Sequence, residues 1–135
     1  MTKKREDRNK PEILIIDDNR DLLEALAGVL GDEGYSVITA CNGVEGIKRT
    51  AESAPDLIIL DLKMPEMDGI ETLRRIRKID EHVIVIILTA YGSAETAREG
   101  MDLNVHEYVS KPFNIEVVKS VVKEALASRR KAKDE

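Results

Sequence analysis

The sequence lacks the features that mark several classes of protein. It contains one cysteine, Cys41, so no disulfide can form within the chain. It has no tryptophan, only 3% aromatic residues, and no apolar run that approaches the roughly 20 residues of a membrane-spanning helix. The N-terminus is charged and has no apolar signal segment. These absences predict a cytoplasmic protein with a reduced thiol and no membrane association.

An excess of positive charge is also missing. The formal net charge of -5 disfavours direct binding to nucleic acid, which depends on clustered lysine and arginine. The 135 residues, 42% hydrophobic and 35% charged, fit one folded domain without internal repeats. We expect a flexible lead-in over residues 1–10, a single domain over residues 11–128 and a charged tail over residues 129–135.

Short apolar runs alternate with stretches of helical periodicity. The runs predict five strands, at residues 13–16, 35–39, 57–60, 83–88 and 107–109. Five helices are predicted after them. Asn42, Ser93 and Asn114 are the expected N-caps, Ser93 for a short helix through Ala97, and Gly34 can end the first helix. Strict alternation predicts an α/β fold, with a doubly wound, five-stranded parallel sheet that is covered on both faces. We expect the flavodoxin-like order 2-1-3-4-5, under which the first and third strands are neighbours at the switch point.

Polar side chains follow four of these predicted strands. Asp17 and Asp18 come after the first, Asp61 after the third, Thr89 ends the fourth, and Lys111 follows the fifth. Because parallel strands deliver their carboxyl ends to one edge of a sheet, these groups are expected to share a site. Any one of them alone has an ordinary interpretation as a cap, a turn acid or a surface lysine, so the prediction depends on their coincidence.

The chemistry of this set points to phosphoryl transfer. Three carboxylates in one pocket repel one another and need a proton or a cation, and their hard oxygen ligands suit Mg²⁺. The Thr89 hydroxyl and the Lys111 ammonium suit donation to phosphoryl oxygens. An acid, a metal pocket, a hydroxyl and a cation together predict phosphoryl transfer onto a carboxylate.

Four blocks of residues follow one another along the chain: Ile15-Ile16-Asp17-Asp18, Leu60-Asp61-Leu62-Lys63-Met64-Pro65-Glu66-Met67-Asp68-Gly69, Leu88-Thr89-Ala90 and Ser110-Lys111-Pro112-Phe113. In this order they resemble the response-regulator receiver domain of two-component signalling, and the resemblance extends from about Glu12 to Leu126. The stretch from Thr89 through Glu95 resembles receivers of the nitrogen-regulator type. Asn104-Val105 stands where many members have Gly-Ala, and asparagine suits the positive φ expected at that turn.

The resemblance implies a role for each acid of the set. Asp61 would accept a phosphoryl group from a phosphohistidine of a sensor histidine kinase or phosphotransfer protein. Asp18, the Asp61 carboxylate and the Lys63 backbone carbonyl would bind Mg²⁺, and Asp17 would act mainly through metal-bound water. The chain would catalyse its own phosphorylation and autodephosphorylation without turning over a separate substrate.

The resemblance also implies how a signal would be read. Thr89 would bond the phosphoryl group, Lys111 would pair with it through a cis Lys111-Pro112 bond, and Tyr108 would be the switch aromatic. Activation would repack the face made by the fourth helix, fifth strand and fifth helix, for a downstream protein target or output domain. A homodimer that forms on phosphorylation is a further candidate. The alternative interpretation of Tyr108 is an ordinary, half-buried aromatic side chain of an edge strand.

Other functions were weighed against this one. An aspartate-nucleophile phosphatase of the haloacid-dehalogenase type uses a similar set, but its nucleophile motif has a second Asp where Lys63 stands, and it usually has a cap domain. A flavin-binding protein would place Ser, Thr and Gly where Asp17-Asp18 stand, and an unphosphorylated adaptor would not need every chemical position filled. A further hypothesis is that Lys63 and Tyr91 limit attack by water and lengthen the phosphoryl lifetime. The kinase, the output and the presence of further domains are left open by the sequence.

Overall fold

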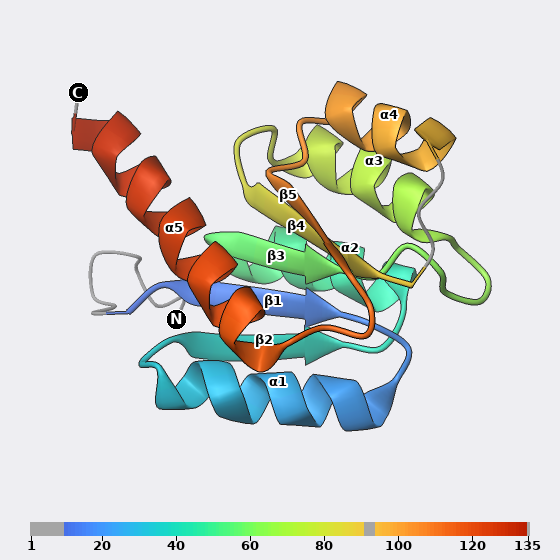
Figure 1. The fold of residues 1–135 in the computed structure, drawn as a ribbon. Coiled ribbons are helices and arrows are strands. Elements are labelled where there is room, and N and C mark those ends of the chain that lie inside the picture. Colours follow the sequence, from blue (N-terminus) through green and yellow to red (C-terminus); the bar gives the residue numbers. More distant parts are fainter. Residues whose placement is uncertain (1–9, 91–93, 135) are drawn as a thin grey trace.

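The computed structural model describes residues 10–90 and 94–134, which form one parallel sheet with helices on both faces (Figure 1). The strand order is β2-β1-β3-β4-β5, which confirms the predicted α/β fold and its order. The strands are β1 Glu12–Ile16, β2 Ser36–Ala40, β3 Leu57–Leu60, β4 Ile84–Thr89 and β5 Glu107–Ser110. Each boundary lies within one residue of its predicted position, as expected for strands recognised by apolar runs alone.

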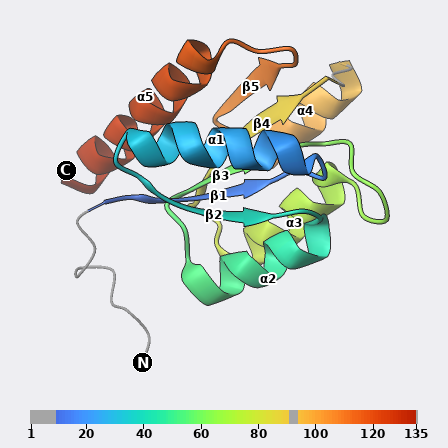
Figure 2. The same cartoon turned by 90° about the horizontal axis from the view of Figure 1, so that it is seen from below.

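Five helices connect and follow the strands. They are α1 Arg20–Asp32, α2 Gly43–Ser53, α3 Gly69–Ile79, α4 Ala94–Asp102 and α5 Ile115–Asp134. Helices α1 and α5 cover one face of the sheet, and α2 and α3 cover the other (Figure 2). Helix α4 contacts α3 and lies against Tyr108 of β5, which packs on the α3 side. The central strands are therefore covered on both faces, which explains why their sequences are continuously apolar.

The pleat of β1 divides its side chains between two cores. Ile13 and Ile15 pack with apolar residues of α1 and α5, whereas Leu14 and Ile16 pack with those of α3. All four side chains are fully buried, and each contributes about 1.5–3 kcal/mol relative to full exposure. The two cores hold β1 and β3 in the centre of the sheet, where the candidate site begins.

Helix ends are fixed by the capping residues that the sequence indicated, with two differences. The Asn42 side chain accepts from the Glu45 N–H at 2.8 Å, and the Asn114 side chain accepts from the Glu116 N–H at 2.7 Å. Asn104 has φ of 65°, which confirms its predicted turn. Helix α4 runs on to Asp102, beyond the short helix through Ala97 that was expected, and its expected cap Ser93 lies outside the described residues.

The second difference is at the carboxyl end of the chain. Helix α5 continues to Asp134 and so includes residues 129–134, which were expected to form a tail. These residues are mostly Arg, Lys and Ala, which are strong helix formers, and no Gly or Pro interrupts them. Residues 1–9, most of the expected lead-in, lie outside the described part of the chain. In the part that is described, no helix has both the length and the apolar character needed to cross a membrane.

Candidate functional site

The carboxyl ends of β1 and β3 bring three carboxylates together. Asp17 and Asp61 continue the sheet hydrogen bonding, since their N–H groups donate to the carbonyls of Ala40 at 3.1 Å and Ile16 at 3.0 Å. Asp17, Asp18 and Asp61 each offer an oxygen within 4.8 Å of the others, with Asp18 exposed and the other two buried. The predicted cluster is thus present at the edge where β1 and β3 lie side by side.

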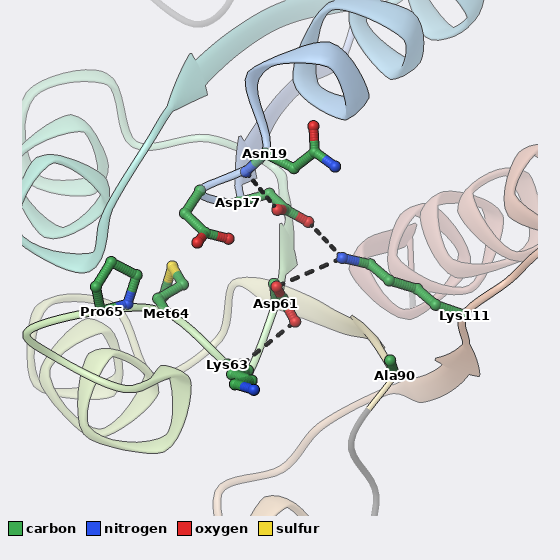
Figure 3. A pocket seen from close by; sticks show the side chains of 9 residues that line it. Asp17, Asn19, Asp61, Lys63, Met64, Pro65, Ala90 and Lys111 are labelled. Carbon is green, nitrogen blue, oxygen red and sulfur yellow. Dashed lines mark hydrogen bonds and ion pairs between the residues drawn. The ribbon is translucent and has the colours of Figure 1, made fainter.

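Lys111 reaches this cluster from the loop after β5. Its Nζ lies 2.9 Å from Asp17 Oδ2 and 3.4 Å from Asp61 Oδ2, so one ammonium bridges two buried carboxylates (Figure 3). The Lys111-Pro112 bond is cis, as expected, and the Lys111 N–H donates to the Thr89 carbonyl at 3.0 Å. The backbone of the loop is therefore anchored to β4 while the side chain points into the cluster.

Burial and charge act in opposite directions on these groups. Burial raises the pKa of Asp17, and hydrogen bonds from Lys111 and from the Asn19 N–H at 2.9 Å only partly oppose that shift. Burial would lower the pKa of Lys111, but its hydrogen bond to Asp17 and the charges of Asp17 and Asp61 outweigh it, so the pKa is raised. Lys111 therefore remains an ammonium that offsets part of the negative charge.

The loop between β3 and α3 forms the opposite wall. The Lys63 N–H donates to Asp61 Oδ1 at 3.3 Å, and the Gly69 N–H closes the loop on the Leu62 carbonyl at 2.7 Å. A Cβ on Gly69 would lie 2.4 Å from Leu62 Cα and 2.5 Å from the Asp61 carbonyl oxygen, so only glycine fits here. The Asp68 side chain then caps α3 through the Glu71 N–H at 2.9 Å.

These walls enclose a cavity of about 470 Å³ over the carboxylates (Figure 3). It is lined by Asp17, Asp18, Asn19, Asp61, Lys63, Met64, Pro65, Ala90 and Lys111. Asn19 was missed by sequence reasoning, although its position after two acids and before a helix marked it as a cap. It caps α1 with its side chain and orients Asp17 with its N–H.

Neither Thr89 nor Tyr108 is among the described residues that line this cavity. Thr89 is buried at the end of β4, directly opposite Ser110 of β5. Tyr108 is half-buried under α4, and its hydroxyl occupies the space that a side chain at Gly100 would need. Burial, together with the charge of Glu99, raises the pKa of the Tyr108 phenol. Tyr108 therefore contacts α4, and its proposed switching stays a prediction.

Comparison with known proteins agrees with this geometry. The family model of the response regulator receiver domain matches residues 13–123. The sporulation initiation phosphotransferase F of Bacillus subtilis is 40% identical over 115 residues, which cover 85% of this chain and 93% of that protein. The transcriptional regulatory protein YkoG of the same organism is 40% identical over 117 residues, 87% of this chain, but the match spans only 51% of that longer protein.

Solved structures lead to the same family. A CheY-like receiver domain protein from Methanospirillum hungatei superposes with a TM-score of 0.90 at 29% identity, covering 92% of this chain and 99% of that one. A CheX-CheY complex with BeF3 and Mg from Borrelia burgdorferi matches with a TM-score of 0.80 at 27% identity, covering 84% and 87% of the two chains. With its sheet order and its acidic cavity at the switch point, the chain belongs to the response-regulator receiver domains of two-component signalling.

Proposed function

We propose that Asp61 is the residue on which this receiver domain accepts its phosphoryl group. The observation that carries the proposal is the position of its carboxylate, buried at the base of an open cavity and 3.4 Å from a lysine ammonium. A buried carboxylate beside a fixed cation is a preorganised nucleophile, and the ammonium offsets part of the negative charge that the acyl phosphate product gains. Asp17 and Asp18 beside it supply the remaining acidic groups.

The reaction transfers a phosphoryl group from nitrogen to oxygen. An Asp61 carboxylate oxygen forms the new P–O bond as the P–N bond of a phosphohistidine breaks, and the leaving imidazole takes a proton from solvent. Asp18, the Asp61 carboxylate and the Lys63 backbone carbonyl would hold Mg²⁺, with Asp17 acting through water, because hard carboxylate and carbonyl oxygens suit that ion. Bound there, Mg²⁺ would neutralise charge on the transferred group.

The Lys111 ammonium and the Thr89 hydroxyl would then bind the new phosphoryl group. Lys111 would move its ammonium from Asp17 and Asp61 to a phosphoryl oxygen, a short step because it already contacts the Asp61 carboxylate. The Thr89 hydroxyl would donate to a second oxygen from the end of β4. Movement of Thr89 would affect Tyr108, because Tyr108 on β5 pairs with Ile87, two residues before Thr89 on β4. We place the output at the face formed by α4, β5 and α5.

The partners follow from this chemistry. We expect a sensor histidine kinase or a phosphotransfer protein as donor, and a protein target, an output domain or a second copy of the chain as the reader of the switched face. Phosphohistidine donors are formed from ATP, so we propose the cytoplasm as the compartment.

The chain would turn over no separate substrate. The effect of Lys63 and Tyr91 on the phosphoryl lifetime stays a prediction, and Tyr91 lies outside the described residues.

The test is incubation with acetyl phosphate and Mg²⁺, followed by intact-protein mass measurement. We expect a gain of one phosphoryl group that Asp61→Asn abolishes. The matched control is Asp68→Asn, an exposed acid of the same loop whose capping function asparagine preserves, and it should keep the adduct. No adduct on the parent chain, or an undiminished adduct on Asp61→Asn, would contradict the assignment. Steady release of phosphate from small monoesters would favour a phosphatase instead.

A further inference from the structure

Asn19 has the one uncharged polar side chain among the described residues that line the cavity over Asp61. The acids of the cavity and Lys111 already have parts in the proposed transfer, whereas the Asn19 amide has none. The backbone N–H of Asn19 holds Asp17 Oδ1 at 2.9 Å, and that bond does not depend on which side chain stands at this position. The amide of the side chain is therefore available for a separate role.

The cap on α1 fixes the orientation of this amide. Asn19 Oδ1 accepts from the Leu22 N–H at 3.2 Å, on the extended backbone of an N-cap residue. Because the oxygen is turned toward the helix, Nδ2 is turned away from it, and Figure 3 shows that nitrogen on the side of Asp17 from which Lys111 approaches. Among the described residues, none accepts a hydrogen bond from Nδ2. Two oriented N–H donors thus remain for a ligand.

The depth of Asp61 decides which part of a phosphodonor Asn19 meets. Asp61 is 6% exposed, at the base of the cavity, whereas Asn19 is exposed at its rim. In phosphoryl transfer the attacking oxygen, the phosphorus and the leaving atom lie roughly in line. Since Asp61 attacks from the base, the leaving atom points outward to the rim. Asn19 is thus placed for the leaving group, whereas Lys111, which contacts Asp61 itself, is placed for the phosphoryl oxygens.

A neutral N–H donor at the leaving atom distinguishes two classes of phosphodonor. When an acyl phosphate reacts, the acyl oxygen leaves with the electron pair as part of a carboxylate, so negative charge develops on it. An N–H donor stabilises that developing charge. When phosphoramidate reacts, the leaving nitrogen is already protonated and departs as neutral ammonia. No negative charge develops on this nitrogen, so the same donor does not favour its departure.

We propose that Asn19 is a specificity-determining residue, whose Nδ2 donates to the leaving oxygen of small acyl phosphates and so favours them over donors with a phosphorus–nitrogen bond. The inference rests on the proposed function of Asp61. Transfer forms the bond between an Asp61 oxygen and phosphorus, breaks the bond between phosphorus and the acyl oxygen, and releases a carboxylate without any proton transfer. The cavity of about 470 Å³ has room for a donor of the size of acetyl phosphate.

The test compares two small donors on a variant that keeps the cap. Serine is about as good an N-cap as asparagine but has no amide, so Asn19→Ser removes the donor and preserves the start of α1. Phosphorylation by acetyl phosphate and by phosphoramidate is timed with Mg²⁺ by intact-protein mass, which gives an apparent second-order rate constant for each. We expect Asn19→Ser to lower the constant for acetyl phosphate about tenfold and that for phosphoramidate by less than about twofold.

Asn42 provides the matched control. It caps α2 in the same way, through the Glu45 N–H at 2.8 Å, and is not among the described residues that line this cavity. Asn42→Ser should leave both rate constants within about twofold of those of the parent chain. Asn19→Ala loses the cap as well as the amide, so it should be less stable toward urea but show the same ratio of the two constants as Asn19→Ser.

The ratio of the two constants decides the outcome. A ratio in Asn19→Ser equal to that of the parent chain would overturn the proposal, and so would an equal fall with both donors, which is the result expected of a residue that acts only on the helix or on Asp17. Failure of the parent chain to be phosphorylated by either donor would instead contradict the proposed function, and this inference with it.

Discussion

Replacing Lys111 by methionine removes the only positive charge that contacts two buried carboxylates in the described site. The Lys111 Nζ lies 2.9 Å from Asp17 Oδ2 and 3.4 Å from Asp61 Oδ2, and the two carboxylate side chains are only 3% and 7% exposed. Methionine keeps the length and most of the apolar contacts of the lysine stem. The substitution therefore removes the charge and little else. It is expected to lower the unfolding free energy and to raise the affinity for Mg²⁺.

The stability effect follows from the burial of the pair. Removing one partner of a buried ion pair typically costs about 3–5 kcal/mol, because the other charge is left uncompensated. The Lys111 side chain is itself 21% exposed, so water offsets part of this, and we expect a loss of about 2–3 kcal/mol in unfolding free energy at pH 7 without divalent ions. The deficit should shrink toward pH 4. Without the hydrogen bond from Lys111, the pKa of Asp17 rises further and the carboxylate is neutralised more readily.

The metal effect has the opposite sign. An ammonium in the same pocket repels a divalent cation, and at about 4–6 Å in a water-like dielectric this repulsion amounts to about 1–2 kcal/mol. Lys111→Met should therefore bind Mg²⁺ about five- to thirtyfold more tightly than the parent chain. Urea unfolding followed by circular dichroism, with EDTA or with Mg²⁺, gives the stability, and calorimetric titration gives the affinity.

A second lysine provides the control. Lys119 on α5 is 26% exposed on its side chain and pairs with Glu33 and Glu116, which are themselves well exposed. Lys119→Met should cost less than about 1 kcal/mol and leave Mg²⁺ affinity unchanged. The reasoning fails if Lys111→Met is as stable as the parent chain at pH 7 in EDTA, or if its Mg²⁺ affinity is unchanged or weaker.

Three further outcomes are expected. Gly28→Ala should stabilise the chain by about 0.5–1 kcal/mol in urea unfolding, because Gly28 is exposed within α1 and a Cβ there meets nothing within 4 Å. Gly69→Ala should destabilise it by about 1–3 kcal/mol and slow phosphorylation by acetyl phosphate, because the added Cβ displaces the loop that bears Asp61. The folded-state pKa of Asp17 is raised from 3.8, so its contribution to stability is complete below that pH and is lost as pH rises through the folded value. In EDTA, the unfolding midpoint of Asp17→Asn should therefore increase relative to that of the parent chain as pH rises. A difference in midpoint that stays constant with pH would contradict this.

Much of the fold could be read from the sequence because local and tertiary forces agree. The run Leu57–Leu60 is apolar on both faces, and the structure buries it between two layers of helices. Asn42 and Asn114 cap the helices that follow them, and Asn104 adopts the positive φ that few other residues accept. Alternation of strands and helices fixed the parallel sheet, and so the edge at which Asp17 and Asp61 meet.

Other features depended on contacts between distant segments. The length of α4 was underestimated because its few apolar residues give a weak periodic signal, and its end is set by Asn104 and by hydrogen bonds from α3. Along the sequence Arg74, Arg75 and Arg77 look alike, as one basic stripe on a helix. Only packing against the turn before β5 separates Arg77, which is half-buried on carbonyls, from Arg75, which remains in solvent.

The sequence by itself determined which chemical groups reach the functional edge, because the alternation of strands and helices predicts parallel strands, whose carboxyl ends lie at one edge of the sheet. Tertiary structure decided how those groups act on one another. It placed the Lys111 ammonium between two buried carboxylates, set Tyr108 against Gly100, and tied the end of α4 to Arg77. Distances of a few ångströms and the exclusion of water govern these interactions, and both arise only when segments far apart in the chain are packed together.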